Sequence, residues 1–143
     1  MKTTIKTICL LAFLNFAGQS QAQTKEETIS WIKEKIEKYP IYDKNIVKSI
    51  DPCKITVEEY IVENGKEYLY LTSNIPTTPI AFQGKMMFFN KEVVEKIYQN
   101  LNSIEYSSNA AVFDPEKEPE LDKRMLKALI HLNTFCSNKK ETF

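Results

Sequence analysis

Apolar residues recur at helical spacing near both ends of the chain and at strand spacing between them. The first helical stretch covers residues 24–39, and one of its faces carries Ile29, Ile32, Ile36 and Tyr39. Thr24 and Glu27 fit a capping box at its start, and Pro40 ends it. This pattern predicts an amphipathic helix whose apolar face packs on the rest of the domain.

The middle of the chain is rich in β-branched and aromatic residues. Residues 54–63 and 66–73 flank Asn64-Gly65, which is the strongest short signal for a two-residue hairpin turn. Such a turn pairs Ile61 with Tyr68, Tyr60 with Leu69, and Glu59 with Tyr70. We expect a second hairpin from 80–82 and 85–89 around Gln83-Gly84, with core residues in Met86-Met87-Phe88-Phe89.

The other central segments give weaker signals. We expect a strand at 46–50, a loop or edge crossing at 75–79, a short helix at 90–101, and strands at 104–106 and 110–113 joined by a turn at 107–109. The β-branched pair in 90–101 also suits a strand.

The last helical stretch begins after a polar break at 114–119, with Pro119 in its first turn. Leu126 and Ile130 lie opposite its apolar stripe and predict a more deeply buried helix than usual. The stripe consists of Leu121, Met125, Ala128, Leu129, Leu132, Phe135 and Cys136. The chain as a whole predicts an α+β domain with an N-terminal helix, a mainly antiparallel curved sheet of about six to seven strands, and a C-terminal amphipathic helix.

Residues 1–22 have the order of a secretory signal peptide: a lysine-bearing start, a short apolar run and small residues before Gln23. We therefore expect export, periplasmic or extracellular, and a single domain over 23–143. Cys9 lies in the leader, which leaves Cys53 and Cys136. In an oxidising compartment this pair is a disulfide candidate, and two separate buried thiols are the alternative.

Charge and missing motifs exclude several classes of function. Removing Lys2 and Lys6 from the 19 basic residues leaves 17 against 19 acidic ones, a net charge of −2. This balance argues against nucleic acid as a partner, and no stretch after residue 22 is long and apolar enough to span a membrane. One histidine and three glycines provide no catalytic triad, metal site or phosphate loop, so we expect no cofactor and no catalytic residues.

Two stretches carry a resemblance. TKEETISWIKEKIEKY (24–39) and KALIHLNTFCSNKKETF (127–143) resemble small exported proteins of Bacteroidota that have no established function. The order of several short strands before one C-terminal helix is similar to pleckstrin-homology-like domains, with the first helix as an addition. Neither resemblance implies a catalytic residue, and the basic phosphoinositide loop of membrane-binding pleckstrin domains has no counterpart here.

The sequence thus favours a non-catalytic binding or interaction module whose partner is a protein or a small ligand. Its candidate binding residues are Trp31, Tyr60, Tyr68 and Tyr70. Trp31 lies about 100° from Ile32, at the margin of the apolar face, where it either packs at an edge or contacts a partner. The alternatives are a small-molecule carrier or enzyme with a cleft near the tyrosine hairpin, beside Glu58 and Glu59, and an assembly role through an edge strand.

Overall fold

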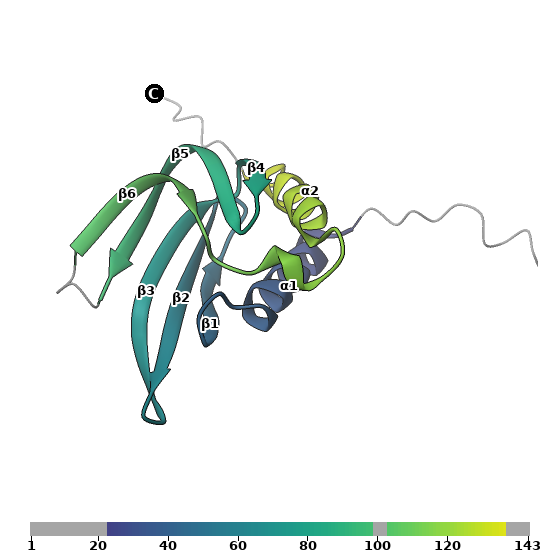
Figure 1. The fold of residues 1–143 in the computed structure, drawn as a ribbon. Helices are drawn as coiled ribbons and strands as arrows, with labels where there is room; N and C mark the ends of the chain where they lie inside the picture. Colours follow the sequence, from purple (N-terminus) through teal and green to yellow (C-terminus); the bar gives the residue numbers. More distant parts are fainter. Residues whose placement is uncertain (1–22, 99–102, 137–143) are drawn as a thin grey trace, which may run out of the picture.

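The computed structural model describes residues 23–98 and 103–136, which form two α-helices and a curved, six-stranded antiparallel sheet (Figure 1). The predicted α+β class is confirmed: one helix precedes the strands of an antiparallel sheet in the chain, and another follows them. The proposed leader, residues 1–22, lies outside the described residues.

The sheet has the order β1-β2-β3-β5-β4, and β6 pairs with β5 off this path. Its strands are β1 (Lys44–Ile50), β2 (Lys54–Glu63), β3 (Lys66–Pro76), β4 (Pro79–Gln83), β5 (Met86–Ile97) and β6 (Ser103–Ala110). The long strand β5 pairs with β4 through its first residues and with β3 through its last. The sheet curves so that β1 contacts helix α1 (Lys25–Lys38) and β4 contacts helix α2 (Leu121–Asn133).

Helix α1 begins as the sequence predicts. The Glu27 backbone N–H donates to the Thr24 hydroxyl at 3.2 Å, and the Thr24 N–H donates to the Glu27 carboxylate at 2.8 Å. This capping box satisfies two backbone donors that the first helical turn leaves free. Ile32 and Ile36 are buried in the core, and Trp31 packs against it while half-buried.

The hairpin between β2 and β3 confirms the Asn64-Gly65 turn. Both residues have positive φ, 52° and 74°, as a type I′ turn requires. The predicted pairs Ile61–Tyr68 and Tyr60–Leu69 form, but Glu59 pairs with Leu71 rather than with Tyr70. A β-bulge inserts one residue into β3 at this point, and a bulge cannot be read from the turn alone.

The short helix expected at 90–101 is wrong over the residues described there. Strand β5 continues to Ile97, and Val93 and Val94 pair with Ser107 and Tyr106 of β6. Strands β3 and β6 pair with this segment on its two sides. The backbone hydrogen bonds to these strands favour a strand over the helix that the apolar spacing also allows.

Two other boundaries also differ from expectation. The segment 75–79 is not one loop, because β3 runs to Pro76 and β4 starts at Pro79. The turn expected at 107–109 is absent from the described chain, because β6 runs unbroken from Ser103 to Ala110. Polar residues in β6 suggested a turn, yet the strand lies at an edge of the sheet, where polar side chains reach solvent.

Helix α2 starts later than predicted and buries one face only. Pro119 precedes the helix, Glu120 is the N-cap residue, and a 3-10 turn at Pro115–Lys117 fills part of the polar break. On the side opposite the stripe Ile130 is 54% exposed and Leu126 is half-buried, so the expected burial of both helix sides is wrong, and Phe135 of the stripe is itself exposed. The buried residues of the stripe are Leu121, Met125, Ala128, Leu129 and Leu132.

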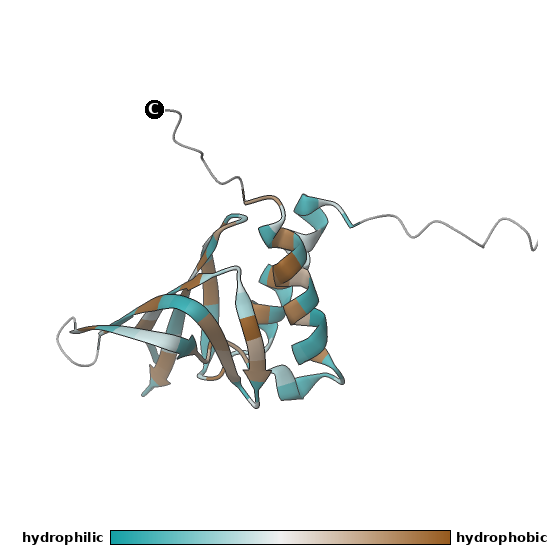
Figure 2. Ribbon diagram, turned by 90° about the horizontal axis from the view of Figure 1, so that it is seen from above, coloured by the Kyte–Doolittle hydropathy of each residue, from teal (hydrophilic) through white to brown (hydrophobic). Residues whose placement is uncertain are grey.

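The core lies between the two helices and one face of the sheet (Figure 2). Ile55 and Val57 of β2, Ile75 of β3 and Val93 of β5 point toward it, and Met87 and Phe89 are buried with them as predicted. Along this inner face polar side chains begin at the buried Ser73, opposite Val57, and Glu59, opposite the buried Leu71. We call the part of the inner face that contains Glu59 and Ser73 its polar half.

Cys53 and Cys136 lie at disulfide distance, with Cα atoms 5.0 Å apart. This separation is inside the range of about 4.4 to 6.8 Å that a disulfide needs. Cys53 precedes β2 and Cys136 follows α2, so the pair connects the end of the last helix to the sheet. Thr77 connects the same two parts of the chain. Its N–H donates to the Cys53 carbonyl at 3.2 Å, and its hydroxyl lies 3.1 Å from Asn133 Oδ1 at the end of α2.

Candidate functional site

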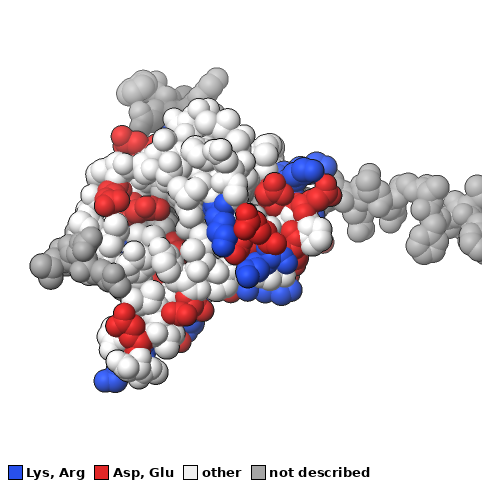
Figure 3. Space-filling model, in the orientation of Figure 1, with Lys and Arg blue, Asp and Glu red and all other residues white. Residues whose placement is uncertain are grey.

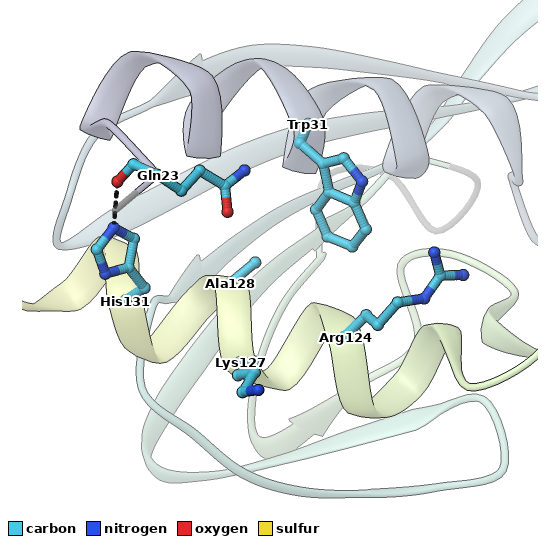
Figure 4. Close-up of a pocket in the computed structure, with 6 residues that line it drawn as sticks. All are labelled: Gln23, Trp31, Arg124, Lys127, Ala128 and His131. Carbon is cyan, nitrogen blue, oxygen red and sulfur yellow. Dashed lines mark hydrogen bonds between the residues drawn. The ribbon is translucent and has the colours of Figure 1, made fainter. Parts of the chain in front are cut away.

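A groove of about 530 Å³ lies between α1 and α2 (Figure 4). Trp31 extends into it from α1, opposite Arg124 and Ala128 of α2. The lining residues are Gln23, Trp31, Arg124, Lys127, Ala128 and His131. Its volume falls within the range of about 300 to 1,000 Å³ that is typical of small-molecule sites.

The sequence of α2 explains why this space exists. Residues 124, 127, 128 and 131 follow helical spacing and fall on one side of α2. A fully packed helix pair would place large apolar residues there, but α2 has Ala128 flanked by long charged or polar side chains. The small side chain leaves room beside the Trp31 ring, and the longer ones form the rim.

The groove is positively charged. Lys127 forms no ion pair with any residue that the structure describes, and Arg124 is held by one side of its guanidinium. Arg124 Nη2 donates to the Glu118 carboxylate at 2.7 Å and to the Pro119 carbonyl at 3.2 Å. These contacts fix the guanidinium at the groove while leaving further N–H donors available.

Glu118 organises this end of the groove. Besides Arg124, its carboxylate accepts hydrogen bonds from Lys35 Nζ at 2.8 Å and from the Tyr39 hydroxyl at 2.6 Å. Hydrogen bonds from Lys35, Tyr39 and Arg124 to the charged form lower the pKa of Glu118 to about 2. Glu118 therefore remains ionised at any ordinary pH and connects α1 to the residues before α2.

At the other end, His131 Nε2 lies 2.8 Å from the carbonyl oxygen of Gln23 (Figure 4). Because a carbonyl can only accept, Nε2 carries the proton and donates it. The ring of Phe135 packs edge-on against His131, with ring centres 5.2 Å apart. His131 is thus a residue that holds the segment before α1 against α2.

The groove lacks the hydroxyl, thiol and carboxylate groups of a catalytic triad. Among the described residues its lining contains no Ser, Thr, Cys, Asp or Glu to serve as a partner of His131. Within residues 23–98 and 103–136, no group of three or more potential ligands could hold a metal ion. The arrangement can bind an apolar or aromatic body through Trp31 and an acidic group through Arg124 and Lys127.

Of the four predicted binding residues, only Trp31 lines this groove. The Tyr60 hydroxyl donates a hydrogen bond to the Glu58 carboxylate at 2.6 Å, on the side of β2 opposite Glu59. Tyr68 lies on the hairpin and is 47% exposed. Tyr70 packs edge-on against Tyr42, with ring centres 4.7 Å apart. The structure therefore does not gather the three tyrosines, and their binding role stays a prediction.

Sequence reasoning missed Gln23, Arg124 and Lys127. The single histidine, His131, is expected from sequence to form no triad or metal site, and its contact with Gln23 is likewise missed. One signal could have found the α2 residues: their polar side chains repeat every three or four positions beside the apolar stripe, on the side that faces α1. Nothing local to Gln23 predicts its place, which depends on how the two helices pack.

Comparisons with protein-family models, curated proteins and solved structures find no match for this chain. Across the described residues, none of the helices combines the length and the apolar character needed to cross a membrane.

Proposed function

We propose that the protein is an exported, non-catalytic binding module that binds a small organic acid with an aromatic or apolar body. The groove between α1 and α2 carries this proposal, because it combines Trp31 with two cationic side chains in a space of about 530 Å³. Trp31 supplies a flat apolar contact, and Arg124 and Lys127 supply charge-assisted hydrogen bonds to a carboxylate.

Export is supported by two independent features. Residues 1–22 follow the signal-peptide order, and Cys53 and Cys136 lie at the distance that an oxidising compartment would convert into a bond. When the full chain is expressed in a bacterium that exports such leaders, mass spectrometry of the exported fraction should give a chain that starts at Gln23. Recovery of the chain with Met1 to Ala22 still attached would contradict export by cleavage.

The groove is tested with aromatic carboxylates such as 4-phenylbutyrate. Trp31 is the single tryptophan of the chain, so ligand binding in the groove should change the intrinsic tryptophan fluorescence. We expect saturable binding of the acid and no binding of the corresponding uncharged amide, because the cations recognise the carboxylate.

Variants then locate the binding site. Trp31→Ala and Lys127→Glu are each expected to weaken binding about tenfold, measured by isothermal titration calorimetry. Lys66→Glu makes the same charge change at the hairpin turn, far from the groove, and should leave the affinity unchanged. Equal losses in Lys66→Glu and Lys127→Glu would mean that overall charge, rather than the groove, attracts the acid.

A further inference from the structure

The polar half of the inner sheet face brings together carboxylates and tyrosines from five parts of the chain. Ser73 of β3 pairs with Glu95 of β5, and Glu95 pairs with Glu105 of β6, so these three side chains form one row. Glu59 of β2 joins the row through Ser73, whose hydroxyl donates to Glu59 Oε1 at 3.2 Å. We call Tyr42, Glu59, Tyr70, Ser73, Glu95 and Glu105 the acid–tyrosine cluster.

The helices leave this cluster uncovered. They contact the sheet mainly at β1 and β4, whereas the row of acids crosses β3, β5 and β6 (Figure 1). On the face shown in Figure 3, acidic side chains lie over the strands as well as beside the helices, where most of the lysine and arginine side chains gather. At the rim of the cluster Tyr42 and Glu105 are exposed and Glu95 is half-buried, whereas Glu59 and Ser73 lie buried beneath them.

No positive charge within the described residues balances these acids. None of the ion pairs formed there includes Glu59, Glu95 or Glu105. Adjacent carboxylates directly opposite each other across two strands repel, so the pair Glu95–Glu105 costs stability unless a cation lies between them. The nearest lysine on β5, Lys96, points to the opposite face and lies over the Tyr98 ring.

Burial increases along the row and ends at an unsatisfied oxygen. Glu105 is exposed, Glu95 is half-buried, and Glu59 is 0% exposed. Glu59 Oε2 has no hydrogen-bond partner among the described residues, although the other carboxylate oxygen, Oε1, accepts from Ser73. When Glu59 is ionised, Oε2 is a buried oxygen without a donor, so a ligand that supplies an N–H donor here would remove the cost of burying it and would favour the ionised form.

Aromatic rings complete the cluster. Tyr42 and Tyr70 pack edge-to-face with ring centres 4.7 Å apart, and Tyr42 is 39% exposed. Glu59 and Glu95 both lie close enough to Tyr42 for their charges to help raise the pKa of its hydroxyl, which burial and Tyr70 raise to about 12. Aromatic faces beside carboxylates attract organic cations by cation–π interaction and by direct charge.

We propose that the acid–tyrosine cluster binds a protonated amine, at a site separate from the groove between the helices. A metal ion does not fit, because the described residues contain no group of ligands close enough to hold one. A quaternary ammonium has no N–H to donate, so it leaves the Glu59 oxygen unsatisfied. An ammonium group enters past Glu105, lies against the tyrosine rings and donates to Glu95 and toward Glu59.

The test uses n-butylamine as the probe and the full chain in its oxidised form. Titration followed by NMR should give saturable shifts of the Tyr42 and Tyr70 ring signals, with no shifts from the neutral N-butylacetamide. Butyltrimethylammonium should bind about tenfold more weakly than butylamine, because it keeps the charge but loses the donors.

Variants assign the site to its residues. Glu95→Gln should weaken butylamine binding about tenfold, and Glu105→Gln by a smaller factor because that side chain is exposed. Glu92→Gln is the matched control, since Glu92 is an exposed acid on the same strand outside the row. Glu105→Gln changes an exposed residue and keeps the test valid even where a buried variant unfolds.

Three results would overturn the proposal: no saturable shift of either tyrosine, equal weakening by Glu92→Gln and Glu95→Gln, or the same tyrosine shifts with calcium chloride. The last would indicate a metal site. Failure of carboxylate binding in the groove would leave this proposal intact, because the two sites share no residue.

Discussion

Replacing Cys53 and Cys136 together by serine is expected to lower the free energy of unfolding by about 4 kcal/mol. The two residues are 83 positions apart, and a crosslink over so long a loop removes much of the conformational freedom of the unfolded chain. A loss of this size should lower the Tm by more than about 10 °C in a domain of this length.

The effect is expected to be mainly on stability rather than on the shape of the folded protein. The Thr77 hydroxyl lies within hydrogen-bonding distance of both the Pro52 carbonyl and the Asn133 amide, so the end of α2 remains attached to the sheet when the sulfurs are removed. The groove lies along the middle of α2, and carboxylate binding by the folded double variant should therefore match that of the original protein.

Thiol counting checks the bond itself. The exported chain that starts at Gln23 keeps two cysteines, Cys53 and Cys136, so alkylation of the oxidised, denatured protein should modify neither, and reduction should expose two thiols. Urea unfolding of the reduced protein should reproduce the stability of the double serine variant. If two thiols react without reductant, Cys53 and Cys136 are not bonded in that preparation.

The elements that the sequence predicts well are those whose signals are local. The Thr24 and Glu27 cap, the Asn64-Gly65 turn and the stripe around Leu129 each depend on residues within one or two turns of each other. Such signals do not require knowledge of the neighbouring strands.

The sequence predictions are wrong where contacts between distant parts of the chain determine the secondary structure or the strand register. Val93 and Val94 suit both a helix and a strand, and β3 and β6, which lie on either side of them, determine the outcome. The bulge in β3 places Leu71 rather than Tyr70 opposite Glu59, which a hairpin built from the turn cannot show. Tyr70 meets Tyr42 instead, from a segment before β1.

The candidate sites were predictable only in part for the same reason. Helical spacing places Trp31 at the edge of the apolar face of α1, where it lines the groove. The groove itself depends on how α1 packs against α2. Trp31 and Arg124, which line it from the two helices, are about 90 residues apart in sequence, so no local pattern reveals it. Similarly, the period of two in β2 places Glu59 on the same face as Ile55 and Val57, yet its burial depends on β1 and β3.

Glu59 should make the protein less stable as the pH rises from about 5 to about 8. Burial raises the pKa of Glu59 to about 8, with the charge of Glu95 acting in the same direction and the Ser73 hydrogen bond opposing them. Tyr42 and Asn45 also face it, and neither supplies a positive charge. In the unfolded chain the carboxyl group titrates near its ordinary pKa of 4.5.

The sign follows from these two pKa values. Below about pH 4.5 both states hold the proton, and Glu59 has no pH-dependent effect on stability. Between 4.5 and 8 the unfolded state loses the proton while the folded state keeps it, so stability falls by at most about 1.4 kcal/mol per pH unit. Above pH 8 both states are ionised and the full cost, several kcal/mol, remains.

Glu59→Gln keeps the shape of the neutral acid and cannot ionise, so it should remove this dependence. We expect the variant to be more stable than the original protein at pH 8, by several kcal/mol, and similar to it at pH 5, as measured by urea unfolding across this range. Glu118 does not disturb the comparison, because its lowered pKa places its own loss of stability below pH 4.5. Glu92→Gln, an exposed acid on β5, should follow the original protein throughout. Parallel pH curves for Glu59→Gln and the original protein would show that Glu59 ionises in the fold near its ordinary pKa, and that the inner face holds its charge without cost.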